Sequence, residues 1–347
     1  MTSLSILDQS PVAEGSAPSQ ALRNTLDLAR LADDLGYHRY WVAEHHGGAM
    51  LAGPSPEALI GPIAAATQRI RVGSGGVMLP HYSPLKVAET FSLLAGLFPG
   101  RIDLGLGRAA GTDPMTAFAL QRDRRQAAPD DFPAQLAELL GYLQGTLPAD
   151  HPFARLSAGL PGLPERPEPW LLGSSHQSAL WAAELGLPYA FADFINPKGA
   201  EIAALYRERF AEHEHAGRHP QTAVAVWVIC ADDDEQAQCV AASGRMAFTL
   251  LRQGRLIAVP PPERAQRFLA AQPPRPEGAG GGRRAVVGAP EAVRSELEEV
   301  IAAYGAQELI AVCVTYEHAA RRRSYELLAE AFGLSREAAQ QPAGARR

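Results

Sequence analysis

The feature that most constrains this chain is an eightfold alternation between short apolar runs and amphipathic helical patterns. Each run is rich in β-branched and aromatic residues and is closed by Gly, Pro, Ser, Asp or His, which is typical of buried strands. The expected strands are Leu4–Asp8, Arg39–Glu44, Ile70–Leu79, Arg101–Gly107, Pro169–Ser174, Tyr189–Phe194, Ala223–Ala231 and Glu308–Thr315. The expected helices, one after each strand, are Ser19–Leu35, Pro56–Thr67, Pro84–Leu97, Pro133–Leu143, His176–Leu185, Lys198–His215, Asp233–Leu251 and His318–Phe332.

Strict alternation of strand and helix implies parallel strands joined by right-handed crossovers. Such a chain forms either a closed eight-stranded barrel or an open doubly wound sheet, and eight units favour closure. We therefore predict an α/β protein folded as a single (β/α)8 TIM barrel. Gly36, Gly96 and Gly186 stand where a left-handed residue is expected to end a helix.

Two stretches fall outside the repeat. Gly145–Glu168 contains five prolines and is expected to be a long loop. Gly254–Gly288 is rich in Pro, Gly and Arg, and a further helix, Ala292–Tyr304, precedes the last strand. Loops of this length in a compact domain are usually lids or disordered segments. We expect one domain over residues 1–335, with a long lid-like insertion at about 254–288 before strand 8 and a flexible tail at 336–347.

Charge and composition exclude several classes of protein. The net charge of −6 provides no basic face for nucleic acid or anionic lipid. No run of eighteen apolar residues exists, and Met1–Asp8 lacks the basic and apolar segments of a signal peptide, so we expect a cytoplasmic protein with no membrane partner. Three scattered cysteines are too few for a disulfide framework or a zinc site.

Polar residues gather where the expected strands end. In a barrel of this kind the carboxyl ends of the strands feed the loops that form the active face. A scaffold without a ligand has little reason to collect histidines, an arginine and glycines on that rim. The rim residues are Asp8 to Pro11, Glu44 to His46, Ser74 to Gly76, Gly105 to Arg108, Gly173 to Ser175, Asp193 and Asn196.

The run from Glu44 to His46 has three interpretations. Metal binding is disfavoured because adjacent residues on an extended strand point to opposite faces, so the two imidazoles do not easily hold one ion; we predict no metal. A histidine beside a cofactor can donate a hydrogen bond or move a proton near neutral pH. The remaining alternative is that the two histidines have only a structural role at the rim of the barrel.

Two glycine-rich turns point to an anionic ligand. Gly105 to Gly107 resembles a dinucleotide fingerprint, but Thr112 to Pro114 interrupts where the helix should start. The alternative is that these glycines let the backbone pass close to a planar ligand while Arg108 reaches an anion. The turn at Gly173 to Ser175 opens a helix and offers amides, hydroxyls and the positive end of a helix dipole. It is either an ordinary helix cap or, with Arg108, a pocket for a phosphorylated ligand.

Four ordered segments resemble the luciferase-like flavin monooxygenases, especially the subgroup without bioluminescence. They are YHRYWVAEHH (37–46), IRVGSGGVMLPHYSPLKVAE (70–89), FPGRIDLGLGRAAGTD (98–113) and WLLGSSHQSALWAAELGLP (170–188). The likeness is dense over roughly the first 200 residues and looser at Ala204–Phe210 and at RRRSYELLAEAF (321–332).

The resemblance implies roles for individual residues. His45 matches the active-site histidine beside the reactive edge of the flavin, and Ser74, Gly75 and Gly76 match a segment, often with a non-proline cis peptide, that lies against the isoalloxazine ring. The residues that match phosphate-holding positions are Arg108, Ser174, Ser175 and Ser178. Gly107 stands near the flavin where the true luciferases carry a cysteine, so the resemblance does not extend to light emission.

The implied activity is that of a flavin-dependent monooxygenase. Reduced FMN from a separate flavin reductase and O2 would act on a small organic substrate, with an apolar aldehyde as the default. The resemblance also implies a homodimer formed through the second and third helices, where Ala64, Ala65 and Ala66 permit close approach. Two alternatives remain open: hydride transfer with a deazaflavin, and a non-catalytic flavin-binding protein of the same fold.

Overall fold

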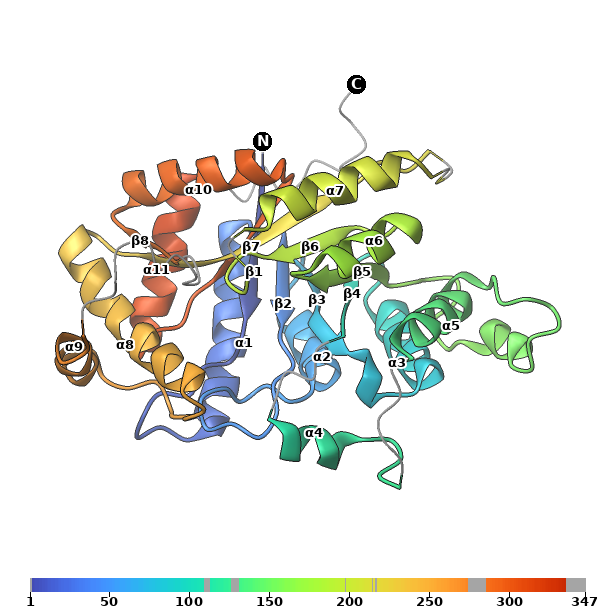
Figure 1. The fold of residues 1–347 in the computed structure, drawn as a ribbon, viewed down its shortest axis with the longest axis horizontal. Helices are drawn as coiled ribbons and strands as arrows, with labels where there is room; N and C mark the ends of the chain where they lie inside the picture. The colour runs from blue at the N-terminus through green and yellow to red at the C-terminus, as the bar shows by residue number, and fades with distance from the viewer. Residues whose placement is uncertain are drawn as a thin grey trace.

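Eight parallel strands close into a barrel in the computed structural model, which describes residues 2–108, 113–125, 131–196, 198–213, 215, 217–273 and 285–334. β1 pairs with β2 and β9, β9 pairs with β7, and β7 pairs with β6, so the ring has no open edge. The predicted (β/α)8 barrel is confirmed (Figure 1). The barrel strands are β1 (Ser3–Asp8), β2 (Arg39–Val42), β3 (Arg71–Met78), β4 (Ile102–Gly107), β5 (Glu168–Gly173), β6 (Tyr189–Ala192), β7 (Thr222–Cys230) and β9 (Glu308–Val312).

Helices surround the barrel, and every predicted helix is found within a few residues of its expected bounds. Among the described residues, none of the helices is both long and apolar enough to cross a membrane. The helices are α1 (Pro18–Leu35), α2 (Pro56–Ala66), α3 (Pro84–Leu97), α4 (Pro114–Leu120), α5 (Phe132–Gln144), α6 (His176–Glu184), α7 (Ala200–Ala211), α8 (Asp234–Arg252), α9 (Pro262–Ala270), α10 (Pro290–Tyr304) and α11 (His318–Ala331), with 3-10 turns η1 (Leu79–His81) and η2 (Ala154–Gly159).

The insertion before the last barrel strand contains structure that the sequence did not predict. α9 packs on α8, and a ninth strand, β8 (Ala285–Gly288), pairs with the end of β7 outside the ring. Residues 274–284, which include Arg283 and Arg284 of the Arg-rich stretch, lie outside the described residues, as does the expected tail at 336–347. The lid role of the insertion stays a prediction.

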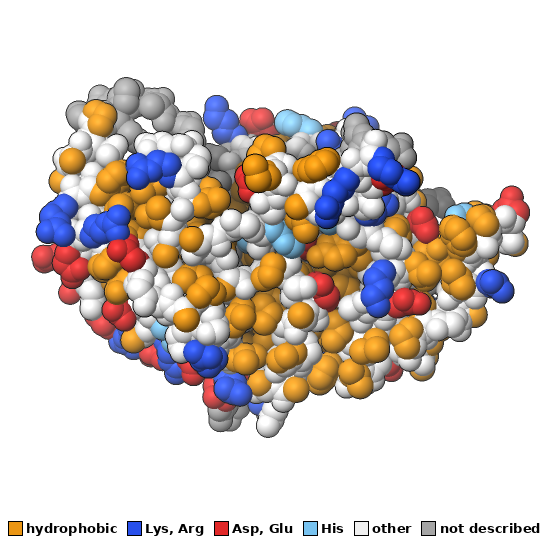
Figure 2. All heavy atoms as spheres, turned by 90° about the horizontal axis from the view of Figure 1, so that it is seen from below, with side chains coloured by type: hydrophobic (Ala, Val, Ile, Leu, Met, Phe, Trp, Pro, Cys, Tyr) orange, Lys and Arg blue, Asp and Glu red, His pale blue; other side chains and the backbone are white. Residues whose placement is uncertain are grey.

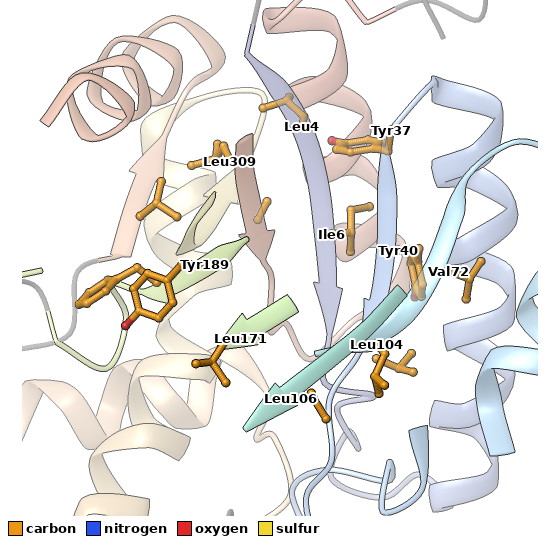
Figure 3. Packing of buried hydrophobic residues seen from close by; sticks show 14 of the residues in the cluster. Leu4, Ile6, Tyr37, Tyr40, Val72, Leu104, Leu106, Leu171, Tyr189 and Leu309 are labelled. Carbon is orange, nitrogen blue, oxygen red and sulfur yellow. The ribbon is translucent and has the colours of Figure 1, made fainter. Parts of the chain in front are cut away.

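Alternation along the strands creates two apolar layers. Outward-facing residues such as Leu4, Ile6 and Leu104 are buried between the barrel and its helices (Figure 3). Inward-facing residues such as Leu7 and Trp41 form a second cluster inside the barrel. The barrel is therefore a packed core, and ligands can enter only at an end of it.

A buried ionic network fills the amino-terminal end of the barrel interior. Arg39 pairs with Asp103 at 2.9 Å and with Glu308 at 3.1 Å, and the Trp41 indole donates to Asp103 at 2.9 Å. Burial raises the pKa of Asp103, but Arg39 and Arg71 outweigh that effect and hold the pKa below its ordinary value. The ionised network closes this end of the barrel and fixes the Trp41 ring.

Glycines let β3 and β4 approach closely at the opposite end. A Cβ atom at Gly105 would lie 2.1 Å from the carbonyl oxygen of Ser74, and one at Gly76 would lie 2.7 Å from the carbonyl oxygen of Gly105. Contacts below 3.0 Å with backbone atoms cannot be relieved by moving a side chain. The two strands therefore leave no room for side chains at these positions.

The glycines predicted to end helices give two confirmed positions and one error. Gly36 and Gly186 have φ of 88° and 64°, as a left-handed helix end requires. Gly96 instead lies inside α3, where a Cβ atom would come 2.7 Å from Cα of Gly162. Its role is to let the 145–168 segment pack against the helix.

Replacing Gly105 by alanine should destabilise the protein, because the added methyl group has no space against the backbone of β3. Overpacking in a core costs about 1–3 kcal/mol, and we expect the free energy of unfolding in urea to fall by about 3 kcal/mol. Gly159→Ala is the control, since a Cβ atom there meets nothing within 4 Å. Equal stability of the two variants would contradict the close-approach argument.

Candidate active site

The carboxyl ends of the barrel strands open on the side where α4 lies, at the bottom of Figure 1. Figure 2 views the molecule from that side and shows histidine side chains near the middle of a face rich in hydrophobic side chains. α4 contributes to the apolar character, because Met115 and Phe118 are 82% and 52% exposed. This is the face on which the sequence placed the candidate residues.

Glu44 organises the segment that carries the two histidines. Its buried carboxylate accepts hydrogen bonds from His46 Nε2 at 2.8 Å, from the Tyr82 hydroxyl at 3.1 Å and from the Met78 amide at 2.9 Å. Burial and the adjacent carboxylate both raise the pKa of Tyr82, so this phenol remains a donor. The sequence placed Glu44 on the rim but gave it no separate role.

His45 is half-buried, and its backbone amide donates to the carbonyl of Gly53 at 2.9 Å. The loop after it has neighbours on two sides. A Cβ atom at Gly47 would lie 2.5 Å from Thr116 Oγ1 of α4, and one at Gly48 would lie 3.5 Å from Leu256 Cδ2. The histidine loop is therefore held between α4 and the segment that follows α8.

Ser74, Gly75 and Gly76 form the β3 part of the site. The Ser74 hydroxyl donates to the carbonyl of Gly105 at 2.8 Å, and the Gly75–Gly76 peptide is cis, as the resemblance leads one to expect. A Cβ atom at Gly75 would lie 2.5 Å from Leu7 Cδ1. Gly107 lies at the end of β4, where a Cβ atom would be 3.3 Å from Met78 Sδ.

Arg108 lies beside the helix that the serine turn opens. β4 and β5 pair in parallel, with Leu106 opposite Leu171, so both strands end at the same edge of the barrel. The Arg108 guanidinium carbon lies 5.6 Å from the centre of the Trp181 ring on α6. The sequence did not single out Trp181, because a lone tryptophan in an amphipathic helix carries no signal of its own.

The first turn of α6 is built around a reciprocal cap. Ser175 Oγ accepts from the Ser178 amide at 3.3 Å, and the Ser175 amide donates to Ser178 Oγ at 3.4 Å. No acidic residue occupies this turn, so nothing there competes with an anion for the helix dipole. Asn196 Nδ2 donates to the carbonyl of Ser174 at 2.9 Å and anchors the turn to the end of β6.

The three serines differ in exposure. Ser174 is half-buried and Ser175 is exposed, whereas Ser178 is buried and its hydroxyl lies 2.9 Å from the Tyr189 hydroxyl. Burial raises the pKa of Tyr189, so this contact stays neutral. Ser178 thus has a structural contact of its own in addition to its predicted place near an anion.

The structure brings all the predicted site residues to one end of the barrel. His45 follows β2, Ser74 to Gly76 lie in β3, Arg108 follows β4 and the serine turn follows β5. Among the residues that the structure describes, no three His, Cys, Asp or Glu side chains form a group that could hold a metal ion. The arrangement places a glycine-rich strand, half-exposed at Gly75, between His45 and the Arg108 side chain beside α6.

An eight-stranded barrel with these polar residues at the carboxyl ends of its strands has the architecture of a TIM-barrel enzyme. The family model described as luciferase-like monooxygenase matches residues 2–308. The chain therefore belongs to the luciferase-like monooxygenase family and is an enzyme of that family.

Individual relatives match over nearly the whole chain. A protein named luciferase-like monooxygenase from Escherichia coli (strain K12) is 40% identical over 93% of this chain and 95% of its own length. The N-acetyl-S-alkylcysteine monooxygenase of Bacillus subtilis (strain 168) is 36% identical over 95% of this chain and 98% of its own.

Solved structures agree with the fold. The crystal structure of apo-MsnO8 has a TM-score of 0.88 and 42% identity, and it covers 96% of this chain and 99% of its own. A type II Baeyer–Villiger monooxygenase from Pseudomonas putida, in complex with FMN, has a TM-score of 0.71 and 21% identity over 95% and 97% of the two chains. The second likeness extends to the fold alone.

Proposed function

We propose that this enzyme is a monooxygenase that uses reduced FMN and O2 on a small organic substrate, with reduced FMN delivered by a separate reductase. The observation that supports it best is the position of Arg108 beside α6, one strand away from the bare backbone of β3. FMN has a phosphate and a flat ring joined by a flexible chain. The phosphate would lie at Arg108 and the ring would lie at the β3 backbone.

The residues present fit FMN. Arg108, Ser174 and Ser175 would hold the phosphate, assisted by the amides at the start of α6. Ser178 would stabilise the same turn, because its amide donates a hydrogen bond to Ser175 Oγ. Gly75 and Gly76 would lie at the ring, with the half-exposed backbone of Gly75 in contact with it. Glycine is needed at both positions because a side chain there would meet Leu7 or the β4 backbone.

Each part of the site has a proposed task in the reaction. Bound reduced flavin would supply the two electrons with which one oxygen atom of O2 enters the substrate and the other leaves as water. His45 would hold or move a proton at its imidazole beside the ring. The Glu44 network would fix the adjoining backbone, and α4 with Leu256 would flank the loop that follows His45.

The substrate class and the assembly are also proposals. The B. subtilis relative at 36% identity is named for S-alkylated N-acetylcysteine, so thioethers join the apolar aldehydes as compounds to screen. We propose a homodimer through α2 and α3, because Leu93 and Leu97 on α3 are 48% and 64% exposed and a partner helix would cover them.

Removing the Arg108 guanidinium should weaken binding of FMN but not of riboflavin, which lacks the phosphate. A charge-assisted hydrogen bond contributes about 1.5–3 kcal/mol, so Arg108→Ala should weaken reduced FMN about 10- to 100-fold under anaerobic titration. Riboflavin affinity should change less than about threefold, which is under 1 kcal/mol. Arg294→Ala on α10 is the control. An equal loss of affinity for FMN and for riboflavin would contradict the assignment of Arg108 to the phosphate.

Replacing His45 should lower turnover strongly while leaving the cofactor bound, since the imidazole is assigned to proton transfer. General acid–base groups contribute about 100- to 10,000-fold, so we expect His45→Ala to lower turnover at least about 100-fold on the best compound in a panel of aldehydes, thioethers and aromatics. Reduced FMN should bind within about threefold of the parent, a difference below 1 kcal/mol. His219→Ala, an exposed histidine, is the control.

The same panel separates the two alternatives. A flavin-storing protein would bind FMN and show no substrate-dependent oxygen consumption. A deazaflavin enzyme would bind the deazaflavin in preference to FMN and would not need O2. Full activity in His45→Ala would contradict the assigned role of the imidazole.

A further inference from the structure

The rim segment at the end of β1, residues 8–11, has no task in the function proposed above. Its backbone pairs with the loop that follows His45. The Ala52 amide donates to the Ser10 carbonyl at 2.9 Å, and Pro11 forms an antiparallel bridge with Leu51. The two segments therefore form a short two-stranded ribbon at the open end of the barrel.

This ribbon holds the backbone of His45. Gly53 follows it directly, and the Gly53 carbonyl accepts the hydrogen bond from the His45 amide at 2.9 Å. A Cβ atom at Gly53 would lie 3.2 Å from the carbonyl oxygen of Ala43 and 3.6 Å from Ser10 Oγ, so there is little free space around this residue. A displacement of Ser10 would therefore displace Gly53 and, through it, the backbone of His45.

Ser10 has a backbone conformation that side chains rarely adopt. Its φ is 50°, and it is the one non-glycine residue with a positive φ among the residues that the structure describes. The Ser10 amide donates to Asp8 Oδ1 at 2.8 Å, and the Ser10 hydroxyl lies 2.8 Å from Thr25 Oγ1. The Thr25 hydroxyl donates its one proton to Asp8 Oδ2 at 2.7 Å, so Ser10 is the donor to Thr25. Asp8 and Thr25 thus hold Ser10 at its amide and at its side chain.

Asp8 is fixed by residues outside the barrel wall. Its buried carboxylate also accepts from the Tyr40 hydroxyl at 2.6 Å and from Arg321 Nη1 of α11 at 3.0 Å (Tyr40 is labelled in Figure 3). Burial raises the pKa of Asp8, but Arg321 and the hydrogen bonds outweigh that effect and hold the pKa below its ordinary value. The carboxylate is therefore ionised at neutral pH, and its four donors leave it little freedom to move.

We propose that Ser10 is a positioning residue for His45, and that Asp8 and Thr25 hold Ser10 in place. Thr25 is fully buried on α1, outside the barrel, so it acts on the site only through Asp8 and Ser10. None of the three residues needs to touch the substrate. The effect on turnover rests on the proposed function, because the position of His45 matters to the rate only if its imidazole takes part in the reaction.

Thr25→Val tests the inference, because it keeps the shape of the side chain and removes the hydroxyl. The matched control is Thr67→Val at the amino-terminal end of the barrel, where the buried Thr67 hydroxyl donates to the Ile63 carbonyl at 2.8 Å and accepts from Arg101 at 2.6 Å. The first measurement is the NMR signal of the His45 imidazole in the full chain labelled with 13C-histidine, assigned by its loss in His45→Ala. It should shift by more than its line width in Thr25→Val and stay in place in Thr67→Val and in Thr25→Ser, which keeps the hydroxyl.

The second measurement is turnover on the best compound of the panel, below the melting temperature of every variant. A small displacement of a catalytic group lowers the rate steeply, so Thr25→Val should lower kcat about tenfold or more. Reduced FMN should bind within about threefold of the parent. Thr25→Ser and Thr67→Val should keep the parent kcat. Ser10→Ala, which removes a single hydroxyl, is the second variant if Thr25→Val does not fold, and it should shift the same signal.

The two kinds of failure are distinguishable. An unchanged His45 signal in Thr25→Val or in Ser10→Ala, or an equal shift in Thr67→Val, would overturn the positioning role of Ser10. A shifted signal with unchanged turnover would support that positioning role and would contradict the catalytic task proposed for His45.

Discussion

The close approach of β3 and β4 at the open end of the barrel is the constraint on which the rest of the site depends. Side chains are excluded there because Gly76 and Gly105 each face the backbone of the other strand. The result is a half-exposed stretch of backbone at Gly75, in a barrel whose interior is otherwise filled by apolar side chains and the Arg39 network. A planar ligand needs exposed backbone of this kind. In a barrel without it, side chains at the strand ends would occupy the space for the ligand.

Charge is distributed so that the two ends of the barrel behave differently. At the closed end, Arg39 and Arg71 are both paired with carboxylates, in a network that contains Asp103, Glu168 and Glu308. At the open end, Arg108 lies on Trp181 and the first turn of α6 carries no acid. We propose that the open end attracts an anion, whereas the closed end contributes to holding the strands in register.

The sequence predicted much of this and missed the rest for identifiable reasons. The eight barrel strands are long enough for their composition to identify them in the sequence. Parallel strands bring their carboxyl ends to the same end of the barrel, which is why the rim residues converge. β8 was missed because four residues after a Pro- and Gly-rich stretch carry little pattern, and its pairing with β7 is tertiary. α4 was missed because its seven residues leave Met115 and Phe118 exposed. The contacts of Glu44 with Tyr82 and Met78 join segments more than thirty positions apart, so no local sequence pattern predicts them.

The central claim is that the β3 surface and the α6 turn hold one phosphorylated flavin between them. A crystal structure of the complex with FMN tests it most directly. The account predicts the phosphate within hydrogen-bond distance of Arg108 and Ser175, and the ring against Gly75 with His45 at its edge. An FMN molecule seated away from these residues would contradict it.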